Sequence, residues 1–188
     1  MPLHIALIQP QIPPNTGNIA RLCAATDTSL HLIEPLGFSI DDTEVRRAGL
    51  DYWGDVDLWV HPSWFAFRDA MDRSRCLYFS AKAEHSYWDA PYKPNSCLVF
   101  GSETDGMPQR ILEKHPEQCF TIPMSGPVRS LNLSTAVGIV LYEAIRQTQG
   151  RNFLAADKRS ASFAGDADKA QQVAMAHPLR GYPNTDKN

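Results

Sequence analysis

Residues 122–146 of this chain are Ile122-Pro-Met-Ser-Gly-Pro-Val-Arg-Ser-Leu-Asn-Leu-Ser-Thr-Ala-Val-Gly-Ile-Val-Leu-Tyr-Glu-Ala-Ile-Arg146. Pro123 ends a short apolar strand here, because proline has no N–H to donate to a β-ladder. From Leu133 onward the apolar positions recur at helical spacing, and either Ser130 or Asn132 can supply the oxygen that caps this helix. A loop rich in polar groups therefore runs directly into a helix N-terminus, which is typical of a binding site.

The overall composition predicts one cytoplasmic domain. The chain has 188 residues, enough to bury a core without metals or disulfides. Its apolar stretches are far shorter than the roughly 20 residues that span a membrane, and its first residues lack the basic flank of a signal peptide. We therefore expect no membrane partner. The cysteines lie far apart, without a CxxC pair, and are expected to be reduced core residues: Cys23, Cys76, Cys97 and Cys119.

The charge distribution argues against a protein that binds nucleic acid over its whole surface, because the net charge is −3. The acidic excess lies in residues 1–150, whereas residues 151–188 carry a small basic excess. Several arginines of the body fall near the loops of interest, which is compatible with a local basic cleft. They are Arg21, Arg46, Arg47, Arg129 and Arg146.

Strand and helix patterns alternate about five times along the chain. This order predicts an open α/β sheet, mostly parallel, with helices on both faces. The expected strands are residues 3–9, 30–33, 56–60, 76–80, 97–100 and 119–122. The expected helices are residues 17–27, 41–49, a helix capped by Ser63 and the helix from Leu133. Residues 81–95 form a long loop, and loops of that length usually have a function.

The chain divides by composition into two parts. Residues 1–150 are expected to form the folded domain, and residues 151–188 a C-terminal extension that is partly disordered. The extension is rich in Ala, Asp, Lys and Ser, with scattered aromatic residues, although residues 169–176 are compatible with a helix.

Three loops, residues 10–18, 101–108 and 123–132, each follow an expected strand. Ligands of open α/β sheets bind outside the carboxyl ends of the strands, so these loops are expected to wall one pocket. The segment 101–106 has the glycine spacing of a phosphate loop, but Met107-Pro108 follows in place of Lys-Ser/Thr. The chain also contains no GxGxxG, HExxH or GxSxG motif, which disfavours dinucleotide, zinc-protease and hydrolase sites.

The blocks Ile12–Thr26, Leu98–Pro108 and Ile122–Leu133 resemble the three motifs of the SPOUT (alpha/beta-knot) RNA methyltransferases. The segment Arg46–Tyr52 further resembles the members that methylate the 2′-oxygen of the tRNA wobble nucleotide, a cytidine or modified uridine at position 34. The resemblance covers about residues 3–150. It implies a C-terminal deep trefoil knot, S-adenosylmethionine as cofactor, tRNA as substrate and a homodimer, with no metal.

The resemblance also implies which residues form the site. The positions that match cofactor contacts are Phe79, Gly101, Ile122 and Ser130. The positions that match the substrate side are Asn15, Arg21, Glu103, Ser130 and Asn132. Candidates for contacts with RNA phosphates are Arg46, Arg47 and Arg129. Taken without the family, Phe79 and Ile122 are compatible with plain core, Ser130 with a helix cap and Glu103 with a solvated loop carboxylate.

Arg21 raises a chemical question, because relatives are proposed to use an arginine at this position as the base. A guanidinium keeps its proton above about pH 12. Our hypothesis is that Arg21 clamps the phosphate beside the target ribose, that Glu103 orients Arg21, and that Asn132 holds its loop. Positioning and desolvation would then supply most of the rate.

Two features depart from the family pattern, and two other functions stay open. Asp105 occupies a position where relatives often carry a basic residue, and the extension after Gly150 has no family role. The positive charge of this extension suggests help in holding tRNA.

Dimerisation is expected through the helix from Leu133 together with helix 17–27, with Tyr142 near the interface. The alternatives are a SPOUT 2′-O-methyltransferase acting on another tRNA position or rRNA, and a non-catalytic knotted RNA-binding module.

Overall fold

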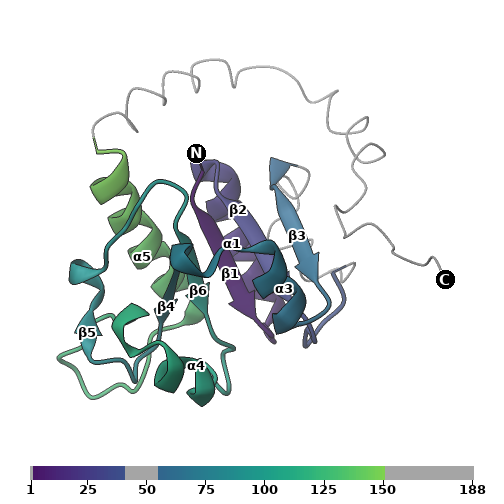
Figure 1. Cartoon of the computed structure of the whole chain (residues 1–188). Helices are drawn as coiled ribbons and strands as arrows, with labels where there is room; N and C mark the ends of the chain where they lie inside the picture. Colours follow the sequence, from purple (N-terminus) through teal and green to yellow (C-terminus); the bar gives the residue numbers. More distant parts are fainter. Residues whose placement is uncertain (1, 41–54, 151–188) are drawn as a thin grey trace.

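The computed structural model describes residues 2–40 and 55–150. Within them a central layer of parallel strands runs in the order β3-β2-β1-β6-β4-β7-β5 (Figure 1). The strands are β1 His4–Ile8, β2 Ser29–Ile33, β3 Leu58–His61, β4 Cys76–Phe79, β5 His85–Ser86, β6 Cys97–Phe100 and β7 Cys119–Thr121. The predicted parallel sheet is thus confirmed, and the strand at residues 97–100 has the predicted bounds.

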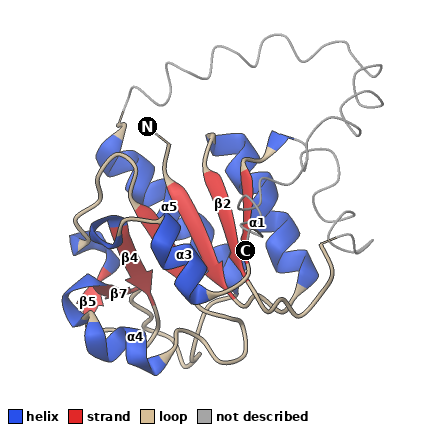
Figure 2. Cartoon of the chain, turned by 45° about the vertical axis from the view of Figure 1, so that its right-hand side comes forward, coloured by secondary structure: helices blue, strands red, loops and turns tan. Residues whose placement is uncertain are grey.

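Helices lie on both sides of the strands (Figure 2). They are α1 Pro13–Thr26, α3 Trp64–Ala70, α4 Gln109–Lys114 and α5 Leu133–Thr148, with short 3₁₀ turns at Arg73–Arg75, Tyr87–Asp89 and Pro116–Gln118. On β1, Ile5 and Leu7 join the core under α1 and α5, whereas Ala6 and Ile8 join the core under α3 and α4. Because both faces are covered, the strands read as continuous apolar runs.

Helix α1 starts four residues before its predicted start at Gly17. The sequence interpretation placed a proline-rich turn here, but Pro13 and Pro14 form the first helical turn. The N–H groups of the first helical turn have no acceptor within the helix, so the missing N–H of proline costs nothing there. The fixed φ of proline also matches the helix, and proline therefore favours a helix start at this point. The helix ends at Thr26, and its C-cap residue Asp27 has a φ of 52°, in the left-handed region.

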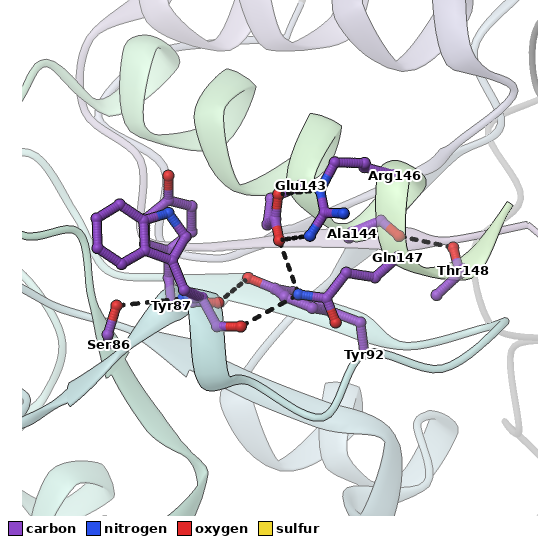
Figure 3. Close-up of polar contacts among 9 residues, drawn as sticks. Ser86, Tyr87, Tyr92, Glu143, Ala144, Arg146, Gln147 and Thr148 are labelled. Carbon is purple, nitrogen blue, oxygen red and sulfur yellow. Dashed lines mark hydrogen bonds and ion pairs between the residues drawn. The ribbon is translucent and has the colours of Figure 1, made fainter. Parts of the chain in front are cut away.

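The long loop 81–95 contains two elements that the sequence did not reveal, β5 and the 3₁₀ turn Tyr87–Asp89, and it is fastened to α5 (Figure 3). The Gln147 side chain donates from Nε2 to the Trp88 carbonyl at 3.2 Å and to Glu143 Oε1 at 2.7 Å. Glu143 also pairs with Arg146 at 2.7 Å. Arg146 thus forms an ion pair within α5. It does not line the cavity described below.

Other predictions divide into confirmed, missed and untested. The Ser63 hydroxyl accepts from the Ala66 amide at 3.1 Å and caps α3 as expected, and the cysteines of the described chain are free and buried. The six-residue helix α4 was missed, because it is too short to show periodicity. The helix predicted at residues 41–49, the extension 151–188, Arg46 and Arg47 lie outside the described residues. The trefoil knot stays a prediction.

Three histidines on neighbouring strands form a hydrogen-bonded row through the sheet. Arg75 Nη2 lies 2.9 Å from His4 Nε2, His4 Nδ1 lies 3.1 Å from His31 Nε2, and His31 Nδ1 lies 3.0 Å from His61 Nε2. Because the guanidinium only donates, each ring in turn accepts at Nε2 and carries its proton on Nδ1. Burial, followed by the nearby Arg75, lowers the pKa of His4 to about 4. Burial and the neighbouring rings lower that of His31 to about 3.

Candidate active site

A cavity of about 660 Å³ opens at the carboxyl ends of β4, β6 and β7. The structure brings the three predicted loops together around it, as expected for an open α/β sheet. The loop after β4 adds a fourth wall, which the sequence interpretation did not assign. The lining comprises Ile12 and Asn15, residues 79–82, residues 100–107, Thr121, Ile122, Met124, residues 129–133 and Ala136.

The Glu103 carboxylate joins the first two walls. It accepts hydrogen bonds from the Gln11 amide at 2.8 Å, the Ile12 amide at 3.2 Å and Asn15 Nδ2 at 3.0 Å. Ile12 is the N-cap residue of α1 and offers no capping side chain. Glu103 therefore supplies the missing cap from a distant part of the chain, and its negative charge suits the positive end of the helix dipole.

Asn15 extends this network to the third wall. Its Oδ1 accepts from Asn132 Nδ2 at 2.9 Å, while its Nδ2 donates to Glu103. Asn132 Oδ1 accepts from the amides of Ser134 at 3.0 Å and Thr135 at 3.3 Å. A carboxylate only accepts and a backbone amide only donates, so the orientation of both asparagine amides is fixed. One chain of hydrogen bonds thus ties all three loops.

The network decides which residue caps α5. Asn132 is that cap, and Ser130, the alternative from the sequence, is left to line the cavity with an exposed side chain. Arg21 is exposed on α1 and does not line the cavity. The predicted contact between Glu103 and Arg21 stays a prediction. The three hydrogen bonds of Glu103 given above hold the start of α1.

The loop after β6 is a closed hairpin, and Gly101 is what allows it to close. Ser102 and Gly106 form an antiparallel bridge, with the Gly106 amide donating to the Ser102 carbonyl at 3.0 Å. A Cβ at position 101 would lie 2.1 Å from the Gly106 carbonyl carbon and 2.2 Å from the Met107 nitrogen. The resemblance assigned Gly101 to a cofactor contact. The structure shows that the loop's own backbone already requires this glycine.

An apolar wall lines the inner side of the cavity. Phe79, 6 % exposed, stacks on Phe100 at 5.2 Å and lies 6.1 Å from Phe120, measured between ring centroids. Phe79 is therefore both core and cavity wall. Ile122 is half-buried and contacts the same core, and the wall continues through Leu131, Leu133 and Ala136.

Charged side chains lie around the mouth. The basic residues that line the cavity within the described chain are Lys82 and Arg129, and the acidic ones are Glu103 and Asp105. Lys82 was not singled out from the sequence, although its place just after the strand at residues 76–80 was a usable signal. In residues 2–40 and 55–150 no group of His, Cys, Asp and Glu is arranged to hold a metal, and no helix there has the length and apolarity to cross a bilayer.

A protein-family model described as the SpoU rRNA Methylase family matches residues 2–142. The chain belongs to the SpoU rRNA Methylase family. Among the relatives of this chain, the tRNA (cytidine(34)-2'-O)-methyltransferase of Burkholderia ambifaria is 48 % identical over 147 residues, which cover 77 % of this chain and 94 % of the relative. The match to the family model ends at residue 142, so residues 143–188 lie outside it.

Solved structures of SpoU proteins share the fold. One, described as "Structural insights into the 2-OH methylation of C/U34 on tRNA", has a TM-score of 0.74 and 49 % identity, and the match covers 77 % of this chain and 95 % of that chain. A more distant one is the SpoU methyltransferase AviRb from Streptomyces viridochromogenes in complex with the cofactor AdoMet. It has a TM-score of 0.69 and 23 % identity, covering 78 % of this chain and 60 % of that chain.

Proposed function

We propose that this chain transfers a methyl group from S-adenosylmethionine to the ribose 2′-oxygen of the tRNA wobble nucleotide, a cytidine or modified uridine at position 34. The observation that carries the proposal is the hydrogen-bonded chain Glu103–Asn15–Asn132 around one cavity. Four of the five residues that the resemblance assigned to the substrate side line that cavity: Asn15, Glu103, Ser130 and Asn132. Relatives of nearly half identity along this part of the chain support the same activity.

The cavity fits the cofactor in size and chemistry. Its volume of about 660 Å³ falls within the roughly 300–1,000 Å³ usual for small-molecule sites. Phe79 and Ile122 offer apolar surface to an adenine ring, and backbone groups at the ends of β6 and β7 offer hydrogen bonds to its edge. The carboxylates at the mouth, Glu103 and Asp105, suit a positively charged sulfonium.

When bound, the cofactor would supply an electrophilic methyl group to the ribose 2′-oxygen, with S-adenosylhomocysteine as the leaving thioether and the hydroxyl proton released to solvent. The chain's contribution is to hold the reactants in line and to exclude water. The tied loops keep the walls in one arrangement before RNA arrives, which is how positioning lowers a barrier. Ser130 is exposed and lines the cavity, and we assign its hydroxyl to a hydrogen bond with the ribose.

Arg21 and Arg129 are assigned to RNA phosphates. Arg21 lies six residues beyond Asn15 on α1, about 9 Å along the helix axis, and its side chain is exposed. We assign it the clamp on a phosphate beside the target ribose. Arg129 lines the cavity itself. A guanidinium offers N–H donors and no acceptor, which suits phosphate binding and not proton removal.

A homodimer in the cytoplasm completes the proposal. Helices α1 and α5 pack against each other, and Tyr142 on α5 is 51 % exposed. A second copy docking on this helix pair would cover that aromatic surface. Sedimentation should then give twice the chain mass, and Tyr142→Asp should shift the protein toward monomer.

The proposal is tested by calorimetry with S-adenosylmethionine and by mapping 2′-O-methyl groups on tRNA. Saturable binding and a methyl group at position 34 are expected, and tRNA from cells lacking the protein should lose that group. Absence of saturable cofactor binding would refute the methyltransferase function. Methylation at another tRNA position or in rRNA would keep the enzyme and reject the target.

A further inference from the structure

Lys82 is a basic residue at the cavity that neither the sequence nor the family match assigned. It belongs to the loop after β4, and β4 lies between β6 and β7 in the sheet. This loop therefore stands between the Gly101–Met107 hairpin and the segment after β7. Lys82 thus reaches the cavity from the middle of its rim, with an exposed side chain.

The backbone of Lys82 is held in place by Ser80. The Ser80 amide donates to the Phe120 carbonyl on β7 at 2.9 Å, which extends the ladder past β4. Ser80 Oγ accepts from the Lys82 amide at 3.2 Å, and the Ser80 carbonyl accepts from the Ala83 amide at 3.2 Å. A fixed backbone lowers the entropy lost when the long lysine side chain takes up a ligand.

The charge of Lys82 is available for binding. Within the part of the chain that the structure describes, Lys82 forms no ion pair. Glu103, which shares the cavity, is committed to the start of α1. Asp105, the other carboxylate that lines the cavity, likewise forms no ion pair with Lys82. An ammonium group held in no ion pair attracts oxyanions, and a lysine binds them as a compact point charge.

We propose that Lys82 is a positioning residue that binds an oxyanion of the reactants at the cavity mouth. The inference rests on the proposed function, which supplies two oxyanions of the same chemistry. One is an RNA phosphate beside the target ribose, and the other is the carboxylate of the cofactor's methionine tail. The Lys82 ammonium holds whichever of them reaches the rim between the hairpin and the segment after β7.

The experiment compares Lys82→Gln, which removes the charge, with Lys82→Arg, which keeps it. Lys93→Gln is the matched control, because Lys93 is exposed on the same loop and does not line the cavity. Cofactor affinity is measured by calorimetry without RNA, and tRNA affinity by fluorescence anisotropy at several salt concentrations. Melting temperatures of all variants are recorded.

If the oxyanion is a phosphate, Lys82→Gln should weaken tRNA binding about tenfold and reduce the slope of log affinity against log salt by about one, with cofactor affinity unchanged. If it is the cofactor carboxylate, cofactor affinity should fall and tRNA affinity should not. In either case Lys82→Arg should restore most of the loss.

Two outcomes would overturn the inference. One is Lys82→Gln matching Lys93→Gln in both affinities. The other is a loss of both affinities with a lowered melting temperature that Lys82→Arg does not restore, since that result indicates a structural role. A failure of the unsubstituted protein to transfer a methyl group would refute the proposed function and not the role of Lys82. The two affinity measurements would still decide that role.

Discussion

Asn15 and Asn132 lie 117 positions apart in the sequence and are joined by a hydrogen bond of 2.9 Å between their side-chain amides. Asn15 lies in the first turn of α1, and Asn132 is the N-cap residue of α5. The Nδ2 atom of Asn15 donates to the Glu103 carboxylate, which can only accept. The Oδ1 atom of Asn132 accepts from backbone amides, which can only donate. The pair therefore has a single arrangement, and it sets how the two helices meet at the cavity.

The two functions of Asn132 can be separated by substitution. Asn132→Asp keeps the cap on α5 but replaces the donor to Asn15 with an acceptor, whereas Asn132→Ala removes both. We expect Asn132→Ala to lower the free energy of unfolding by about 1 kcal/mol more than Asn132→Asp does. Both should lower the methyl-transfer rate about tenfold or more, because the walls lose their alignment. Urea unfolding and single-turnover assays measure these effects, and full activity of Asn132→Asp would show that the amide pair is dispensable.

Glu103 is expected to stabilise the fold as well as the site. Glu103→Gln removes a charge that accepts hydrogen bonds from the Gln11 and Ile12 amides, and should cost roughly 1–2 kcal/mol of unfolding free energy. Asp105→Asn is the control, since it removes one charge from the same hairpin at an exposed position. Equal melting temperatures for the two variants would refute the capping role of Glu103.

The hairpin after β6 should not tolerate a side chain at position 101. Gly101→Ala would place a Cβ 2.1 Å from the Gly106 backbone, and we expect a loss of about 1–3 kcal/mol from the forced rearrangement. Gly126→Ala is the matched change, because a Cβ there meets nothing within 4 Å. Thermal unfolding should separate the two. A Gly101→Ala protein as stable as Gly126→Ala would mean that the hairpin opens freely.

The histidine row predicts a loss of stability in mild acid. The pKa of His31 is lowered to about 3 in the folded chain, whereas an unfolded histidine titrates near 6.5. Below pH 6.5 the unfolded state therefore takes up protons that the native state does not, so stability falls with decreasing pH until the folded pKa is reached. At pH 5, His31 alone should lower the free energy of unfolding by roughly 2 kcal/mol relative to neutral pH. His4 should lower it further, because its pKa is also lowered in the folded chain.

Urea unfolding between pH 7 and pH 5 tests this dependence. His31→Gln should flatten the fall in unfolding free energy, even if the variant is less stable throughout. His85→Gln should leave the slope unchanged, because His85 is an exposed residue whose contact with Glu117 spans 3.9 Å. An unchanged slope in His31→Gln would contradict the assignment of the acid sensitivity to the row.

The sequence interpretation succeeded where a local pattern has a local cause. Continuous apolar runs predicted strands buried on both faces, and helical periodicity from Leu133 predicted the start of α5 correctly. It failed at Pro13, where proline is compatible with both a turn and a first helical turn. It also missed β5 and α4, because two and six residues are too few to display a period.

The site shows the same division. The types and order of the polar residues in three loops were enough to predict one pocket, because the carboxyl ends of parallel strands meet at one edge of the sheet. The partners of those residues were not predictable. The sequence left either Ser130 or Asn132 as the cap of α5, and folding selected Asn132. The sequence did not indicate that Glu103 accepts a hydrogen bond from Asn15, or that Asn15 accepts one from Asn132.

The sequence by itself therefore determined the longer strands and helices, and three of the loops that line the cavity. Propensity, periodicity and capping are set by neighbours a few residues away. Only the tertiary structure decided which polar atoms pair, because a hydrogen bond depends on tenths of an ångström between groups about 90 or more residues apart. Packing of the whole sheet fixes such distances, and no stretch of sequence carries them alone.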